Sequence, residues 1–382
     1  MSVATLQRVY GVMRKEFRQM RRDKRSMGLL LFVPALMLVI FGYAITFDVK
    51  HVKVIVLDRD KSATSREFAD GLFHSEYFDL AGTIERESEA DWWLDAGRAR
   101  AVLIIPPDFG RSIQDRRSVA VQVLVDGSNS NAANVTIGYL NAKVREYNLA
   151  QAQLTATAQG IRLPPLPIAV EPRIWYNPEL RSSQFLVPGL IGYMLMLVGT
   201  VATALSVVRE KERGTMEQII VSPVRSGEFI IGKTLPYLIL CLLTSTLIIV
   251  SAMLLFDLPL RGSVVWLFVT TVIFLLGSLA LGLWVSTVAD TQQVALIIAM
   301  LITMLPAIIF SGMIFPIASM PKVLQWITYI VPPRHDIVIM RSIILKGTGP
   351  EAWTPELLYL VAFALVMLVI ASVRMRKKRS AA

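Results

Sequence analysis

Eight residues near the middle of the chain match a pattern that binds phosphate. GEFIIGKT, residues 227–234, fits G-x-x-x-x-G-K-[ST], in which backbone N–H groups and a lysine hold the phosphates of a nucleotide. A working phosphate loop joins a buried strand to a helix, and a distant acidic residue holds Mg²⁺. The first question is therefore whether this chain itself binds and hydrolyses a nucleotide.

The surroundings of GEFIIGKT argue against a nucleotide site. Its four variable positions are Glu, Phe, Ile and Ile, which are bulky for a close phosphate approach, and an apolar run follows at once. The preceding residues, 214–226, are predicted to form a short helix broken at Pro223. We therefore interpret Lys233 as a basic residue at the inner end of a membrane span, with its side chain extending to the interface.

The composition is that of a membrane protein. The chain has 382 residues, of which 54% are hydrophobic, and a mean hydropathy of +0.54. Runs free of Asp, Glu, Lys, Arg and His approach or exceed the length of about 20 residues that a helix needs to cross the hydrocarbon layer. The predicted spans are residues 27–47, 184–208, 234–256, 263–289, 291–315 and 357–373.

Charge and reactive residues narrow the class further. Although the net charge is +10, residues 48–181 have a net charge of −2, so the basic excess lies beside the apolar runs and does not indicate nucleic acid. Basic residues precede the first span and follow the last, which predicts that both termini are cytoplasmic. The single cysteine, Cys241, permits no intrachain disulfide, and the three histidines lack metal-ligand spacing.

The long stretch between the first two spans has the pattern of an α/β domain. Branched residues predict strands at 51–58, 100–106 and 119–126, and helices are expected at 65–73, 89–97 and 129–154. Ahead of the first span, apolar residues recur at helical spacing, which predicts an amphipathic helix in the inner interface. The apolar residues of that helix are Leu6, Val9, Tyr10, Met13, Phe17 and Met20.

These patterns divide the chain into five parts. They are a cytoplasmic interfacial helix (1–25), the first span (26–47), an extracytoplasmic α/β domain (48–183), spans two to six (184–373) and a basic cytoplasmic tail (374–382). The fourth part contains a cytoplasmic loop at 209–233. It also contains a charge-free stretch that prolines break, which we expect to form short helices re-entering from the outer face over 311–335.

Several segments resemble the permeases of ABC-2 type exporters, in the drug-efflux-like branch. They are VVREKERGTMEQIIVSPVRSGEFIIGKTLPYL (207–238), LDAGRARAVLIIPPDFGRSI (94–113) and SGMIFPIASMPKVLQWITYIVPPRH (311–335), and a fourth is RIWYNPELRSS (173–183), which leads into the second span. The resemblance implies a membrane all-α bundle of six transmembrane helices with an inserted extracytoplasmic α/β domain. It also implies a bacterial inner-membrane protein.

The resemblance further implies roles for particular residues. A coupling helix that docks on an ATPase would comprise Glu212, Arg213, Gly214, Thr215, Met216, Glu217 and Gln218. An outer gate would include Ser311, Gly312 and Pro316. No cofactor is expected on this chain, because ATP and Mg²⁺ would bind a separate ABC-type ATP-binding subunit. The other expected partners are a second permease copy or a paralogue, and membrane lipid; a periplasmic adaptor is left open.

The function expected from these features is export. The chain would be the permease that moves an amphipathic, drug-like or lipid-like solute outward, while the enzymatic step belongs to the partner. One alternative is a membrane-anchored sensor or assembly scaffold whose outer domain binds a ligand. Another is an ion-coupled carrier, which the absence of ionisable residues from the predicted spans disfavours.

Overall fold

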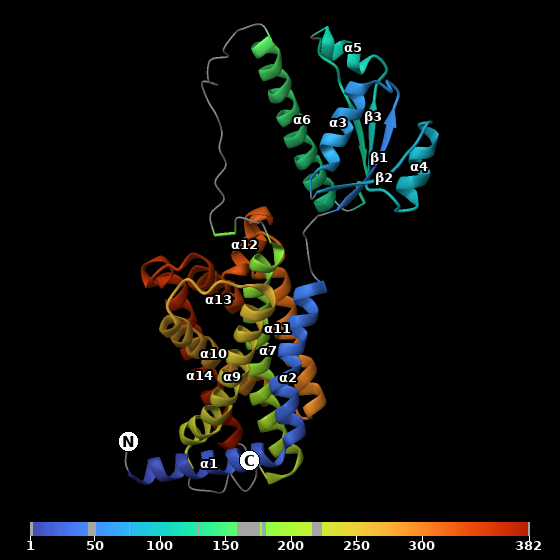
Figure 1. The fold of residues 1–382 in the computed structure, drawn as a ribbon. Coiled ribbons are helices and arrows are strands. Elements are labelled where there is room, and N and C mark those ends of the chain that lie inside the picture. The colour runs from blue at the N-terminus through green and yellow to red at the C-terminus, as the bar shows by residue number, and fades with distance from the viewer. Residues whose placement is uncertain are drawn as a thin grey trace. The chain divides into compact units, whose positions relative to one another are not determined.

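The computed structural model describes residues 3–44, 51–75, 77–115, 117–128, 130–158, 176–177, 181–215 and 224–380. The chain divides into two compact units, of which one comprises Met1–Thr46 with Ile174–Ala382 and the other Phe47–Arg173. The first unit is a helical bundle and the second contains a β-sheet (Figure 1). Each is described separately below.

The bundle contains the six helices of the described chain that are long and apolar enough to cross a membrane. They are α2 (Lys24–Ala44), α7 (Ser182–Glu212), α9 (Ser226–Phe256), α10 (Val264–Val288), α11 (Gln292–Phe310) and α14 (Thr354–Ser380). Several extend beyond the charge-free runs of the sequence, most clearly α7 and α9, whose additional turns carry charged residues. The first span ends at Ala44, and the predicted extension to Phe47 lies outside the described residues.

Helix α7 forms the centre of the bundle. In the most apolar 18 residues of α7, 89% are buried, compared with 22% in the corresponding part of α2 and 17% in that of α14. Glycines let its neighbour α10 approach closely: a Cβ added at Gly282 would lie 2.3 Å from the carbonyl oxygen of Thr200. The outer helices therefore present apolar faces to their surroundings, as lipid-facing spans do, whereas α7 contacts protein on nearly all sides.

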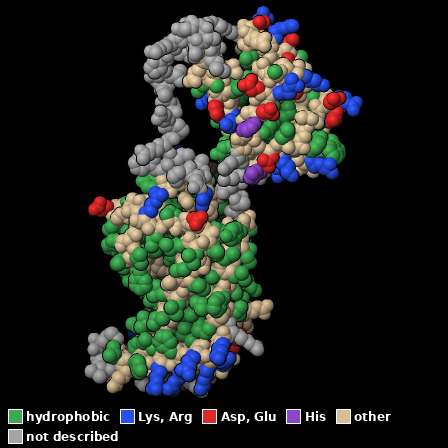
Figure 2. All heavy atoms as spheres, viewed as in Figure 1, with side chains coloured by type: hydrophobic (Ala, Val, Ile, Leu, Met, Phe, Trp, Pro, Cys, Tyr) green, Lys and Arg blue, Asp and Glu red, His purple; other side chains and the backbone are tan. Residues whose placement is uncertain are grey.

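The two ends of the bundle differ in construction. At one end α1 (Val3–Arg22) packs against the start of α9 and contacts the end of α7; we call this the α1 end (Figure 1). Figure 2 shows hydrophobic side chains over the middle of the bundle and Lys and Arg side chains gathered along the α1 end. The opposite end, called the α13 end, is built from short helices: η1 (Ile317–Ser319), α12 (Lys322–Thr328), α13 (Pro332–Arg341), η2 (Ser342–Lys346) and η3 (Pro350–Ala352).

The second unit is a four-stranded sheet with helices on both faces. Its strands are β1 (Val52–Asp58), β2 (Phe78–Thr83), β3 (Ala101–Ile105) and β4 (Gln122–Val125), in the order β2-β1-β3-β4. Strand β1 is parallel to β2 and β3, whereas β4 is antiparallel to β3. The helices are α3 (Ala63–Phe73), α4 (Ser88–Asp95), α5 (Phe109–Gln114) and α6 (Ser130–Ala158).

Two apolar cores hold this sheet. Phe68 of α3, Phe109 of α5 and Leu140 of α6 pack on one face, and Ala90 and Trp93 of α4 pack on the other. The sequence predicts three of the four strands but misses β2, because FDLAGT has only one fully buried residue and so lacks the alternation that marks a half-buried strand. Helix α5 was missed as well, being only one and a half turns long.

Candidate functional site at the α1 end of the bundle

GEFIIGKT forms the first turns of helix α9. The carboxylate of Glu228 accepts a hydrogen bond from the backbone N–H of Arg225 at 2.9 Å, which helps to start the helix, and it pairs with Arg8 of α1 at 2.9 Å. No strand precedes this helix within the described part of the bundle, and the helical backbone from residue 226 onward leaves no loop to surround a phosphate. The structure thus agrees with the prediction that this motif is the start of a span.

The two residues that gave the motif its phosphate-binding appearance have structural roles. A Cβ added at Gly232 would lie 2.8 Å from the Cβ of Val12 and 3.1 Å from the carbonyl oxygen of Val9, so glycine is what allows α1 to lie directly on α9. The next residue, Lys233, is fully buried by this contact. The expectation that its side chain extends to the interface is wrong, because α1 covers it.

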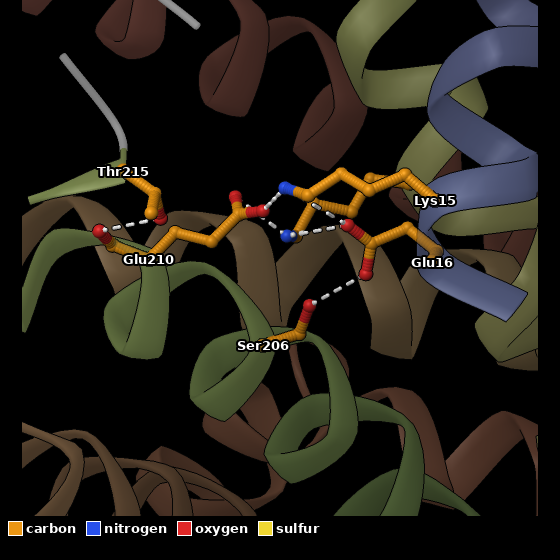
Figure 3. A network of polar contacts seen from close by, with 6 residues as sticks. Lys15, Glu16, Ser206, Glu210 and Thr215 are labelled. Atoms are coloured by element: carbon orange, nitrogen blue, oxygen red, sulfur yellow. Dashed lines mark hydrogen bonds and ion pairs between the residues drawn. The ribbon is translucent and has the colours of Figure 1, made fainter. Parts of the chain in front are cut away.

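The Lys233 ammonium group is held by two buried carboxylates. Its Nζ lies 3.1 Å from Oε1 of Glu16 on α1 and 2.7 Å from Oε2 of Glu210 on α7. Lys15 of α1 pairs with the other oxygen of Glu210, and the Ser206 hydroxyl donates to Glu16 at 3.4 Å. Figure 3 shows Lys15 and Glu16 reaching from α1 toward Ser206 and Glu210 of α7. A buried charge is tolerated when it is paired in this way, and losing one partner is costly.

Glu210 belongs to a set of four consecutive residues, Arg209–Glu212, that we call the α7 hub. Arg209 pairs with Asp23, in the break between α1 and α2, and donates to Ser26 at 3.2 Å. It also donates to the Gln292 side chain of α11 at 3.2 Å. Burial alone would raise the pKa of Asp23, but hydrogen bonds from Ser26 and the ion pair with Arg209 leave it below its ordinary value.

The other two hub residues bind the ends of two further helices. Lys211 donates to the carbonyl oxygens of Ser286 and, at 3.0 Å, Ala289, at the C-terminal end of α10. Glu212 accepts from the backbone N–H of Gln292 at 2.7 Å, at the N-terminal end of α11, and also from its side chain. The signs complement the helix dipoles, with a cation at a C-terminus and an anion at an N-terminus. One turn of α7 is thereby attached to α1, α2, α9, α10 and α11.

The predicted coupling residues are only partly described. Glu212 closes helix α7 and takes part in the hub, and Arg213 and Gly214 follow, the latter with a positive φ of 69°. The hydroxyl of Thr215 donates to the carbonyl oxygen of Glu210 at 3.2 Å, which satisfies an open carbonyl at the helix end. Met216, Glu217 and Gln218 lie outside the described residues, as does most of the predicted helix at 214–226.

Sequence reasoning missed the ion pairs of this site. The overlooked residues are Lys15, Glu16, Asp23, Arg209, Glu210 and, in its true role, Lys233. One signal could have found Glu16: it lies three residues after Met13 and four before Met20, so an acidic residue occupies the apolar stripe of α1. A carboxylate on a face that packs against protein needs a cation nearby.

The predicted gate residues lie at the α13 end. Ser311 follows the last turn of α11, where it is buried and donates to the carbonyl oxygen of Ala307. Gly312 has a positive φ of 78°, which turns the chain and brings Met313 against Gly189 of α7. Pro316 directly precedes η1. Ser311 and Gly312 thus form a tight turn whose next residue packs on α7, and Pro316 lies beyond this turn, at the start of the short helices.

The fold and this site define a multi-pass helical membrane protein whose central helix ends in a hub of ion pairs. A family model described as ABC-2 family transporter protein matches residues 24–373, and the chain belongs to this family.

Curated relatives match over most of the chain. The probable multidrug ABC transporter permease YbhS of Escherichia coli K12 is 32% identical, over 98% of each protein. The probable multidrug ABC transporter permease YbhR of the same strain is 30% identical, over 90% of this chain and 91% of the relative. ABC transporter G family member 20 of Dictyostelium discoideum is 25% identical over 96% of this chain, which corresponds to 50% of that protein.

Proposed function

We propose that this chain is the transmembrane permease subunit of an ATP-driven ABC-2 type exporter, which moves an amphipathic, drug-like or lipid-like solute out of the cytoplasm or inner membrane. The observation that carries the proposal is the α7 hub. Four consecutive residues attach the central helix to five other helices, immediately before the segment expected to bind an ATPase. A displacement of residues 213–218 would thus be transmitted to most of the bundle as a rigid body.

The proposal assigns sides and partners. The α1 end is cytoplasmic, because the basic residues gather there, and the α/β unit is extracytoplasmic, inserted between spans one and two. ATP and Mg²⁺ bind a separate ABC-type subunit, which docks on residues 212–218. Two permease chains, identical or paralogous, enclose the pathway in a bacterial inner membrane, and the turn at Ser311, Gly312 and Pro316 belongs to its outer gate.

Impermeant thiol labelling in intact cells tests the sides. Cys241 is fully buried, so the natural chain gives little background. Single cysteines at Ser75 in the α/β unit and at Ser319 at the α13 end should be labelled from outside. A cysteine at Arg18 of α1 should react only after the membrane is opened. The opposite labelling pattern would overturn the assignment of sides.

Reconstitution tests the activity. The chain is purified with the ATPase that co-purifies with it and is placed in vesicles with a fluorescent amphipathic dye. The account expects dye movement that requires ATP and stops when residues 213–218 are replaced by a flexible linker. A scaffold or sensor would keep its function after that replacement. An ion-coupled carrier would move dye with a proton or sodium gradient and no ATPase, and either result would contradict the proposal.

A further inference from the structure

Two cavities of different chemistry meet beside the α7 hub. The first is an apolar slot of about 350 Å³ between α2, α7 and α11. Its walls include Met27 and Met37 of α2, Met194 and Leu197 of α7, and Met300 of α11. Methionine side chains adapt to ligands of varied shape, and the volume is at the lower end of the range for ligand cavities, which suits one narrow apolar chain.

The second cavity is a basic groove of about 850 Å³ between α1, the end of α7 and the start of α11. Arg14, Arg18 and Arg22 line it from one face of α1, since residues four apart lie above one another on a helix. All three are exposed and form no ion pair with the described residues. Arg213 adds another cation, and the only carboxylate among the described lining residues is Asp23.

The slot and the groove share part of their walls. Gln19, Asp23 and Arg209 line both cavities, so the apolar slot ends where the basic groove begins. Acidic groups alone, as on the charged surface of a soluble protein, would occupy the groove and leave the slot empty, and an uncharged hydrophobic molecule would leave the arginines without a counter-ion. The chemistry that satisfies both is a negatively charged head joined to an apolar chain.

We infer that these adjoining cavities form one binding site for an anionic amphipath, with its head group among the α1 arginines and its chain in the methionine-lined slot. The inference rests on the proposed function, because it narrows the class of solute. The occupant enters from the inner leaflet, where α1 lies. Because Arg209 and Asp23 are walls of the site and members of the hub contacts, occupancy acts directly on the turn of α7 that precedes the coupling segment.

Equilibrium binding to the permease and its co-purified ATPase, without nucleotide, tests the site. The probe is radiolabelled dodecyl phosphate at concentrations below its micelle threshold. Unlabelled dodecyl phosphate should displace it. Dodecanol, which lacks the negative charge, and inorganic phosphate, which lacks the apolar chain, should compete poorly. Equal displacement by dodecanol would overturn the inference, as would equal displacement by inorganic phosphate.

Paired variants locate the bound probe. Arg18→Gln should weaken binding about fivefold, the effect of one arginine on an anionic lipid head, and the matched change Arg21→Gln, on a residue outside the groove, should not. Met37→Trp should fill the slot and prevent binding, whereas Leu36→Trp, on the exposed face of α2, should leave it intact. Thermal unfolding of each variant confirms folding. Loss of the ATPase subunit from Arg18→Gln with unchanged probe binding would mean that the groove docks an acidic protein surface, and would overturn the inference.

Addition of ATP distinguishes a transported substrate from a resident membrane lipid at this site. If the labelled amphipath moves to the opposite leaflet when ATP is added, it is a transported substrate. If it stays bound and raises the ATPase rate, it is a resident lipid of the inner leaflet that regulates the hub; both outcomes support the site. Absent probe binding alongside ATP-driven export of a dye would sink this inference and leave the proposed function standing.

Discussion

The two ends of helix α7 are held in opposite ways. At its α1 end, Arg209–Glu212 form charged contacts with five helices, and the buried carboxylates of Glu16 and Glu210 share the Lys233 ammonium. At its α13 end, glycines let side chains pack against the backbone: Gly189 faces Met313 and Gly192 faces Asp336. Neither carboxylate oxygen of Asp336 has a hydrogen-bond partner among the described residues.

This contrast has a mechanical meaning. Charge-assisted hydrogen bonds are directional and keep several helix ends in one fixed arrangement, so the α1 end behaves as a clamp. At the α13 end of α7 the glycine contacts depend mainly on shape and can repack at low cost. The charged contacts there are fewer: Arg341 donates to the Phe185 carbonyl oxygen at 2.8 Å, and Arg181 pairs with Asp257 at 3.0 Å. The account therefore assigns force transmission to the α1 end and movement to the α13 end, and each substitution below acts on one side of that comparison.

The largest effect is expected from Lys233→Met. It leaves Glu16 and Glu210 facing each other in a buried site with only Lys15 as counter-charge, which should cost about 3–5 kcal/mol of unfolding free energy. Denaturant titration in mixed micelles measures the loss, and the exposed Lys322→Met at the α13 end is the control. Adding Glu16→Gln to Lys233→Met should restore part of the stability. If Lys233→Met were as stable as the control, the charge cluster would not hold the helices together.

A smaller loss is expected from Gly232→Ala. The new Cβ would press on Val12 and on the carbonyl oxygen of Val9, a strain of about 1–3 kcal/mol that alanine's better helix propensity offsets only in part. Because one of the contacts is with the backbone carbonyl of Val9, shortening Val12 to alanine should not restore the stability of the variant fully. Full rescue by Val12→Ala, measured by the same titration, would show that α1 is not fixed in place.

The corresponding change at the other end, Gly189→Ala, should be nearly neutral. The atoms nearest to its Cβ would belong to the Met313 side chain, with Cγ at 2.4 Å and Cβ at 3.0 Å. A change of rotamer moves the Cγ away, and the helix gains about 1 kcal/mol from alanine. A net change below about 1 kcal/mol is expected, and the double variant with Met313→Ala should be no less stable than Met313→Ala alone. A loss as large as that of Gly232→Ala would remove the difference between the two ends.

The smallest effect is expected from Arg8→Ala. The Arg8 side chain is 30% exposed, so its pair with Glu228 is partly screened, and Glu228 keeps its hydrogen bond from the Arg225 backbone. The loss should stay below about 1 kcal/mol and should shrink further at high salt. Melting curves of Arg8→Ala at low and high ionic strength check both expectations. A large loss of stability that salt does not reduce would show that the Arg8–Glu228 pair also fixes the helices at the α1 end.

Much of the bundle could be predicted from the sequence, because hydrocarbon thickness fixes the length of a charge-free run. The helix ends could not. A criterion that excludes charge stops α7 at Val208 and starts α9 at Thr234, whereas the helices continue to Glu212 and back to Ser226. Their charges are neutralised by partners elsewhere in the chain, and Lys233 and Glu16 are separated by 217 positions, a distance over which periodicity gives no information.

The phosphate-loop motif illustrates the same limit. Its letters fit a nucleotide site, and its context correctly argued against one, but only the packing of α1 on α9 explains why Gly232 and Lys233 stand together. The resemblance to ABC-2 permeases directed attention to Glu212 and the residues after it. In the structure, the contacts with the other helices begin in the preceding turn, at Arg209, Glu210 and Lys211.

The central claim is that the α7 hub transmits the motion of the partner ATPase to the bundle. The most direct test is the amount of solute exported per ATP hydrolysed in reconstituted vesicles, for Glu212→Arg beside Glu351→Arg, an exposed glutamate at the α13 end. Reversing the charge at Glu212 places a cation at the N-terminus of α11 and breaks its contact with Gln292. The account predicts that ATP hydrolysis continues while export per ATP falls about tenfold, and that the control is unchanged. An unchanged ratio in Glu212→Arg would contradict the account.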